Sequence, residues 1–93
     1  MKRIRDLSQD SSNIVWTTHV REQMNKRGID SEDVLRILRT GDVENAPTQG
    51  RSADEWKMKV TRKMRGGRVA GVVTILVKDQ TLRLITAEWE DYR

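Results

Sequence analysis

The chain has 93 residues, the length of one domain, with 35% hydrophobic residues, 34% charged residues and a net charge of +4. It has no cysteine and a single histidine, so disulfides and thiolate metal sites are excluded and a zinc centre lacks ligands. No apolar run approaches the roughly 20 residues of a membrane span, and the start MKRIRDLSQDSS lacks the apolar stretch of a signal peptide. We therefore expect a cytoplasmic protein that needs no metal, cofactor or membrane.

The chain begins with a polar segment. We expect residues 1–13 to be a flexible N-terminal segment, with SQDSSN as a linker. The folded part is then a single domain over residues 14–93, and the apolar residues 14–16 can form a short strand where it begins.

A first helix is predicted from residue 18 onward. Thr18 is a suitable N-cap and Gly28 a suitable left-handed residue after the last turn, so the helix should end at about Arg27. Met24 and Ile29 then occupy the two apolar positions that meet in a Schellman ending.

A second helix carries clearer signals. Asp30 and Asp33 have the spacing of a capping box, Ile29 and Val34 that of a hydrophobic staple, and Gly41 follows as a stop. The apolar stripe that should face the core comprises Val34, Leu35, Ile37 and Leu38. The two helices should therefore form a tight helical hairpin.

The second half of the chain has the period of strands. After a loop over residues 42–55, with a short strand near Val43, three strands are predicted: 56–63, 69–77 and 81–89. Tight turns at 65–68 and 78–80 should join them, and in the last strand Leu82 and Leu84 should share a face with Thr86. The prediction is an α+β domain with two N-terminal helices packed on an antiparallel sheet of three to four strands.

Charge is distributed unevenly along the chain. Residues 56–68 hold six basic residues and no acid, whereas residues 30–55 hold seven acids against three arginines. A basic surface stripe beside an acidic region suggests a polyanion on one face and a protein partner on another.

The order of these elements, together with THVREQMNKRGI, the acidic cap, the helix ending in glycine and the last strand LITAEWE, resembles the bacterial DUF4258 family. The resemblance runs from about Trp16 to Trp89, and the family is similar in outline to BrnT and to RelE-type toxins of toxin–antitoxin pairs. It implies a RelE-like fold with a curved sheet, relatives that cleave mRNA free or on the ribosome, and a small antitoxin as partner. The family's polar positions match His19, Arg27, Thr86 and one basic sheet residue, for which Lys57, Lys59 and Arg62 are alternatives, and Met24 stands where the family often has a second basic residue.

Metal-free RNA cleavage needs a proton acceptor and cations beside the phosphate. At the first helical position, His19 would feel the positive end of the helix, which favours a neutral imidazole that acts as base. The guanidinium of Arg27 suits a phosphate, Lys57 adds a cation, and Thr86 can donate a hydrogen bond. The predicted catalytic residues are thus His19, Arg27, Lys57 and Thr86. The predicted RNA-binding residues are Lys59, Arg62, Lys63, Arg65, Arg68 and Trp56.

Each of these residues has a structural alternative. A histidine at a helix start is often a surface or capping residue, and Arg27 can complement the helix dipole. The strand lysines can simply lie on a solvent-exposed face of the sheet, and Trp56 can belong to the core. Thr86 can be present only because threonine favours strands.

Three hypotheses for the function follow. The first is a toxin-like, metal-independent endoribonuclease that is neutralised by a small antitoxin. The second is a non-catalytic RNA- or ribosome-binding module. The third is a small protein-interaction domain that docks through Asp54, Glu55 and the tail at residues 88–93.

Overall fold

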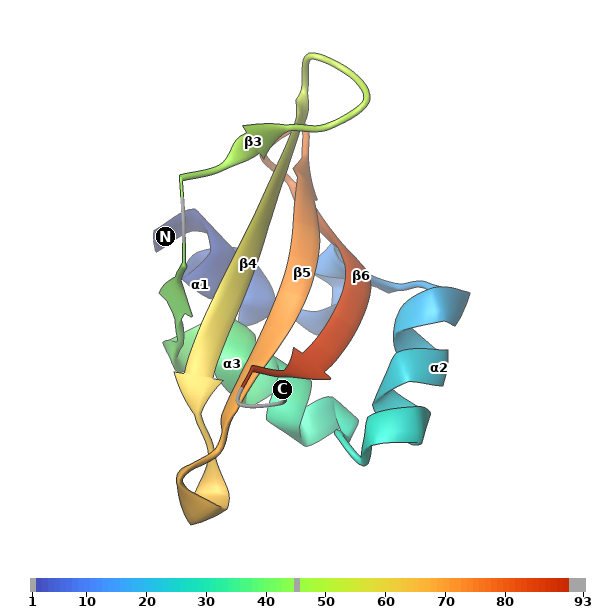
Figure 1. Ribbon diagram of the computed structural model, residues 1–93. Helices are drawn as coiled ribbons and strands as arrows, with labels where there is room; N and C mark the ends of the chain where they lie inside the picture. The colour runs from blue at the N-terminus through green and yellow to red at the C-terminus, as the bar shows by residue number, and fades with distance from the viewer. Residues whose placement is uncertain (1, 45, 91–93) are drawn as a thin grey trace.

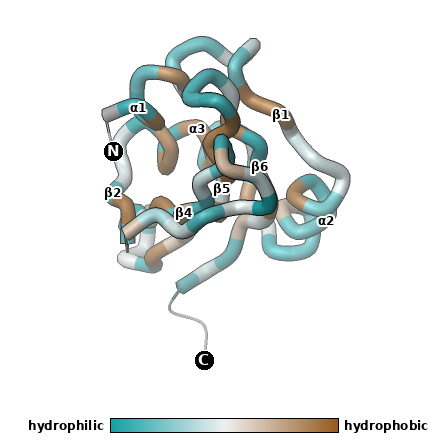
Figure 2. The backbone as a smooth tube through the Cα atoms, turned by 90° about the horizontal axis from the view of Figure 1, so that it is seen from above, coloured by the Kyte–Doolittle hydropathy of each residue, from teal (hydrophilic) through white to brown (hydrophobic). Residues whose placement is uncertain are grey.

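Three α-helices pack against a six-stranded mixed sheet. The computed structural model describes residues 2–44 and 46–90. The elements are α1 (Lys2–Ser8), the 3₁₀ turn η1 (Ser11–Asn13), β1 (Ile14–Trp16), α2 (Thr18–Arg27), α3 (Ser31–Thr40), β2 (Asp42–Val43), β3 (Thr48–Gln49), β4 (Glu55–Lys63), the 3₁₀ turn η2 (Arg65–Gly67), β5 (Val69–Val77) and β6 (Thr81–Trp89). In Figure 1, α1 and α3 lie behind the sheet, α2 lies beside β6, and the front face carries no helix. Figure 2 shows the same one-sided arrangement from above.

The sheet corrects the predicted fold. Its strand order is β1-β6-β5-β4-β2, β3 also pairs with β4, and β1 runs parallel to β6. The prediction of two helices on an antiparallel sheet of three to four strands is therefore wrong, although the α+β class and the three long strands are confirmed. The RelE-like outline stays a prediction. β1 and β2 lie where short strands were predicted, at residues 14–16 and near Val43. β3 was missed, because two residues are too few for alternation to show in the sequence.

The N-terminal segment is part of the folded domain. The sequence predicts flexibility over residues 1–13, but α1 buries Ile4 and Leu7, which are 1% and 7% exposed. Arg39 Nε on α3 also donates a hydrogen bond to the carbonyl of Ser8 at 2.9 Å. Two apolar residues in a polar heptapeptide are a weak helix signal, and packing against the rest of the domain supplies the missing stability.

The predicted helical hairpin is confirmed in detail. Gly28 is left-handed with φ of 69°, and the amide of Ile29 donates to the carbonyl of Met24 at 2.9 Å, as in a Schellman ending. Asp30 and Asp33 form a reciprocal capping box, with distances of 2.8 and 3.3 Å between side-chain oxygens and amides. Local capping chemistry thus determines where both helices meet.

Gly41 ends α3 for a steric reason. Its φ of −81° is accessible to any residue, but a Cβ at this position would lie 2.5 Å from the carbonyl oxygen of Thr61 and 2.6 Å from that of Ile37. The close approach of α3 to β4 therefore requires glycine.

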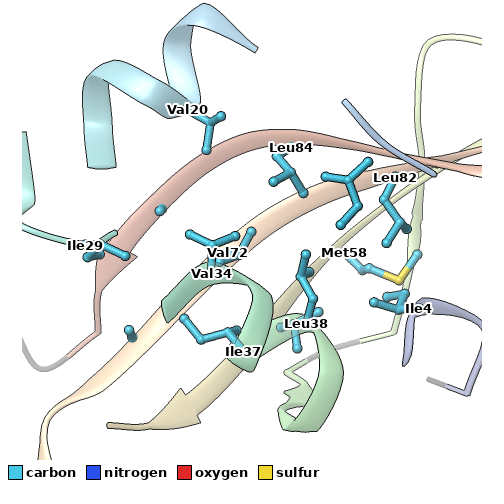
Figure 3. Close-up of a cluster of buried hydrophobic side chains, with 14 of the residues drawn as sticks. Ile4, Val20, Ile29, Val34, Ile37, Leu38, Met58, Val72, Leu82 and Leu84 are labelled. Carbon is cyan, nitrogen blue, oxygen red and sulfur yellow. The ribbon is translucent and has the colours of Figure 1, made fainter. Parts of the chain in front are cut away.

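The core lies between the helices and one face of the sheet. Figure 3 shows Ile37 and Leu38 of α3 beside side chains of the sheet, with Ile4 of α1 completing the layer. We call the opposite face of the sheet, which this hydrophobic layer does not cover, the outer face.

A bulge in β6 changes the predicted face of Thr86. Val73 pairs with Thr86 and Thr74 pairs with Leu84, so Ile85 is an extra residue. Ala87, which is fully buried, therefore continues the core face of Leu84, and Thr86 moves to the outer face. No helix in residues 2–44 and 46–90 is long and apolar enough to cross a membrane.

Candidate functional site

His19 lies at the start of α2, one position later than predicted. The N-cap is Thr17, not Thr18, because the Thr17 hydroxyl accepts from the amide of Val20 at 3.1 Å and donates to the carbonyl of Leu84 at 2.7 Å. The tertiary contact with β6 distinguishes two threonines that are equally good caps in the sequence. The His19 side chain is exposed and has no hydrogen bond to a described residue.

Arg27 is held at the other end of α2. Its Nη1 donates to the carbonyl of Ala87 at 2.9 Å, and Trp89 Nε1 donates to the Arg27 carbonyl at 2.9 Å. His19 and Arg27 are eight residues apart, which separates their Cα atoms by about 12 Å along the helix. Arg27 thus ties α2 to the end of β6, and the structure does not bring the predicted histidine–arginine pair into contact.

Lys59 is the centre of an ionic cluster on the outer face. Its Nζ lies 2.8 Å from Glu90 Oε1, 3.1 Å from Glu88 Oε2 and 3.5 Å from Glu44 Oε1. We call these four residues the Lys59 cluster. Because three carboxylates surround one ammonium, the charge of Lys59 is compensated and the cluster has an excess of negative charge.

The two glutamates of β6 and its end share this ammonium unequally. Burial raises the pKa of Glu88, but the hydrogen bonds of Lys59 and Glu90 outweigh it and hold that pKa below its ordinary value. Burial raises the pKa of Glu90, and its hydrogen bond with Glu88 adds to the rise against the opposing effect of Lys59. Burial alone would lower the pKa of Lys59, but the hydrogen bonds to Glu90 and Glu88 raise it instead. The cluster is therefore a tightly coupled acid–base group.

Gly71 makes room for this cluster. A Cβ at Gly71 would lie 2.8 Å from Glu90 Oε2 and 3.2 Å from Lys59 Cδ, so both side chains cross above the bare backbone of β5. Sequence reasoning missed Glu44 and assigned Glu88 and Glu90 to a docking tail, not to an ionic cluster with Lys59. The alternation of Glu88 and Glu90 at the end of the last strand was the available signal, but only the strand register shows that they face Lys59.

Two further predicted residues lie on the outer face. Thr86 and Lys59 both flank Val73 in one cross-strand row, and Lys57 lies one row away. Lys57 is exposed and has no ion pair with a described residue. A shallow pocket of about 320 Å³ beside it is lined by Glu44, Ala46, Thr48, Lys57, Met58, Lys59 and Val73. The negative cluster at its rim makes this pocket unfavourable for a phosphate.

Cationic side chains gather instead at the end of the sheet where β4 turns into β5. The Arg68 guanidinium lies 4.1 Å from the centroid of the Trp89 ring, and Trp89 is hydrogen-bonded to Arg27. Lys63 and Arg65 belong to the same hairpin, are exposed, and form no ion pair with a described residue. We call Arg27, Lys63, Arg65 and Arg68 the basic end.

Arg62 points away from the outer face, and Trp56 lies far from the basic end. Arg62 Nε donates to Thr40 Oγ1 of α3 at 2.6 Å, so this guanidinium points toward the helical side of the sheet. Trp56 is 42% exposed but lies seven residues before Lys63 on β4, about 23 Å away along the strand. Trp56 is therefore too far from the basic end to belong to the same contact surface.

The acidic residues proposed for protein docking are partly engaged. Asp54 Oδ1 accepts from Ser52 Oγ at 2.6 Å, and Glu55 forms an ion pair with Arg83 at 3.3 Å. Residues 91–93 of the predicted docking tail lie outside the described residues. Within residues 2–44 and 46–90, no group of three or more histidine, aspartate or glutamate side chains is arranged to hold a metal ion.

Comparison with known proteins gives one match. The family model described as "Domain of unknown function (DUF4258)" matches residues 16–89. No curated protein matches the chain, and no solved structure does. The match covers the segment from the end of β1 to the end of β6.

Proposed function

The chain belongs to the DUF4258 family, and from that premise we propose that it is an RNA-binding module that contacts the phosphate backbone with its basic end. The observation that carries the proposal is that arginines from two distant segments, Arg68 and Arg27, meet at the end of β6. The Arg68 guanidinium stacks on the Trp89 ring, Trp89 Nε1 donates to the backbone carbonyl of Arg27, and the Arg27 guanidinium donates to the carbonyl of Ala87. Lys63 and Arg65 extend the positive surface along the hairpin.

The chemistry of these side chains suits a polyanion. Arginine presents a planar fork of donors that matches phosphate oxygens, and stacking on an aromatic ring orients that fork. The Lys59 cluster supports the same location by contrast, because its excess of carboxylates repels phosphate from the outer face. RNA, rather than DNA, follows from the sequence resemblance to RNA-cleaving toxins, and it agrees with the cytoplasmic location that we propose.

Binding of RNA is tested by a salt titration. Fluorescence anisotropy of a labelled single-stranded RNA should show an affinity that falls as salt rises from about 50 to 200 mM, with a slope of roughly −0.7 per phosphate contact. The double variant Lys63→Ala/Arg65→Ala should lose two contacts and lower the slope by about 1.4. Absence of binding at the lowest salt, or a slope unchanged in the variant, would contradict the proposal.

Endoribonuclease activity is a further prediction from the sequence resemblance. It is favoured by His19, whose exposed imidazole has no hydrogen bond to a described residue and is therefore available to a substrate. The test is incubation with RNA and with translating ribosomes in EDTA, beside His19→Ala. Cleavage that disappears in His19→Ala would add catalysis to binding. If expression of the protein is toxic and a small protein encoded by the neighbouring gene relieves that toxicity, the antitoxin would be identified as well. Binding without cleavage in either setting would leave the non-catalytic module.

A further inference from the structure

A second basic site lies on the helical side of the molecule. A shallow pocket of about 390 Å³ on α3 is lined by Glu32, Leu35, Arg36, Arg39 and Thr40, and we call it the α3 pocket. It holds two guanidinium groups against one carboxylate, and none of its residues was among the RNA-binding residues predicted from the sequence. Figure 1 shows α3 behind β4, near the end of the strand that leads into the β4–β5 hairpin.

The two arginines of this pocket have donors to spare. The Arg36 side chain is exposed and has no hydrogen bond or ion pair with a described residue. Arg39 is anchored by one bond, from its Nε to the Ser8 carbonyl at 2.9 Å, and its two terminal nitrogens have no partner in the part of the chain that the structure describes. One guanidinium is thus exposed without a hydrogen-bond partner among the described residues, and the other is held by the Ser8 carbonyl. Such a pair can bind the oxygens of a phosphate.

The α3 pocket is connected to the basic end through Arg62. Thr40 Oγ1 donates to the Arg36 carbonyl at 2.6 Å and accepts from Arg62 Nε at 2.6 Å. Arg62 Nη1 in turn donates to the carbonyl of Lys63 at 2.9 Å, and Lys63 belongs to the basic end. These hydrogen bonds join the carbonyl of Arg36, the hydroxyl of Thr40, the guanidinium of Arg62 and the carbonyl of Lys63, so they place Arg62 between the pocket and the hairpin.

We propose that the α3 pocket is a second phosphate subsite, so that one RNA strand runs from the basic end past Arg62 to Arg36 and Arg39. This inference rests on the proposed function and extends it, because it assigns a path for the strand on the helical side of the sheet. Leu35, which is half-buried at the floor of the pocket, offers an apolar surface to the ribose or base that adjoins the phosphate. The Lys59 cluster lies on the other side of the sheet from Arg62 and the α3 pocket.

Glu32 provides an internal check on whether positive charge in the α3 pocket strengthens RNA binding. It lines the same pocket as Arg36 but carries the opposite charge, so it opposes a phosphate that the arginines attract. Glu32→Gln should therefore tighten RNA binding, whereas Arg36→Ala should weaken it.

The experiment is the anisotropy titration with a labelled single-stranded RNA long enough to reach both sites. Arg36→Ala should lower the salt slope by about 0.7 and weaken binding about fivefold near 0.1 M salt, the effect of one lost phosphate contact. Arg51→Ala is the matched control: Arg51 is also exposed, its side chain has no hydrogen bond or ion pair with a described residue, and it lies in the β3–β4 loop. Arg51→Ala should leave the slope and affinity unchanged.

The outcomes separate this inference from the function on which it rests. If Arg36→Ala matches Arg51→Ala while Lys63→Ala/Arg65→Ala weakens binding, the α3 pocket is not a subsite and the basic end alone binds RNA. If neither the α3 nor the hairpin variants change binding, both proposals fail. Because Arg36→Ala removes an exposed side chain, its circular dichroism spectrum should match that of wild type. If the spectrum differs, the same titration is carried out with Arg36→Glu.

Discussion

The ammonium of Lys59 illustrates how neighbours decide the role of a single residue. Its position on an exposed strand face suggested phosphate binding, but three carboxylates lie within 3.5 Å of its Nζ. A phosphate would have to displace these carboxylates, whereas Lys63, on the same strand, has no such competitor among the described residues. Two lysines of one strand thus have different chemistry available to them.

Glu88→Gln should flatten the acid side of the stability profile. Because the folded-state pKa of Glu88 is lowered, its contribution to the free energy of unfolding is present above its unfolded pKa and is lost as the pH falls through the folded pKa. Wild type should lose more stability than Glu88→Gln between pH 7 and about 3, by roughly 1 kcal/mol or less because the side chain is 34% exposed. Urea denaturation at each pH measures this.

Glu90→Gln is the control for that profile. The raised pKa of Glu90 means that folding disfavours its charged form relative to the unfolded chain, so a neutral amide should cost less stability at pH 7 at this position than at Glu88. Parallel pH profiles for wild type and Glu88→Gln would contradict the assigned coupling.

Two glycines should differ in their cost of substitution. Gly41→Ala places a Cβ against two backbone oxygens at 2.5 and 2.6 Å, and we expect a loss of about 3 kcal/mol or more, since neither backbone can yield cheaply. Gly28→Ala meets no atom within 4 Å and has only the left-handed φ of 69° against it, so about 1 kcal/mol is expected. Equal losses in chemical denaturation would show that close packing does not explain Gly41.

At the scale of elements, the parts of the fold that capping and alternation specify locally were predictable. The α2–α3 hairpin and the strands β4, β5 and β6 follow from residues within a few positions of each other. The parts that depend on distant contacts were not: α1 is stabilised by burial, and the N-cap of α2 is decided by the bond from Thr17 to Leu84 on β6.

Ile4→Ala tests whether α1 belongs to the core. Ile4 is 1% exposed, so its truncation should lower the free energy of unfolding by about 2 to 5 kcal/mol. Asp6→Ala, on the exposed side of the same helix, should cost less than about 0.5 kcal/mol. A flexible N-terminal segment would instead predict that both variants unfold like wild type in thermal or chemical denaturation.

At the scale of the molecule, the basic stretch at residues 56–68 was visible in the sequence but its surface was not. Strand alternation sends Lys57 and Lys59 to the outer face and Arg62 to α3, while Arg65 and Arg68 lie beyond the strand at the hairpin. The glutamates that neutralise Lys59 come from elements that only the sheet register and the fold bring beside it. Composition therefore predicted a cationic protein, and only the three-dimensional structure assigned the cations to separate surfaces.

The central claim is that RNA contacts the hairpin end of the sheet and not the part of the outer face around Lys57 and the Lys59 cluster, and two lysines of one strand test it most directly. Lys57 and Lys63 share β4 and its outer face, and both are exposed without an ion pair to a described residue. In the salt titration, Lys63→Ala should reduce the slope by about 0.7 and Lys57→Ala should leave it unchanged. The reverse, a reduced slope in Lys57→Ala with Lys63→Ala like wild type, would place RNA beside Lys57 and the Lys59 cluster and contradict the account.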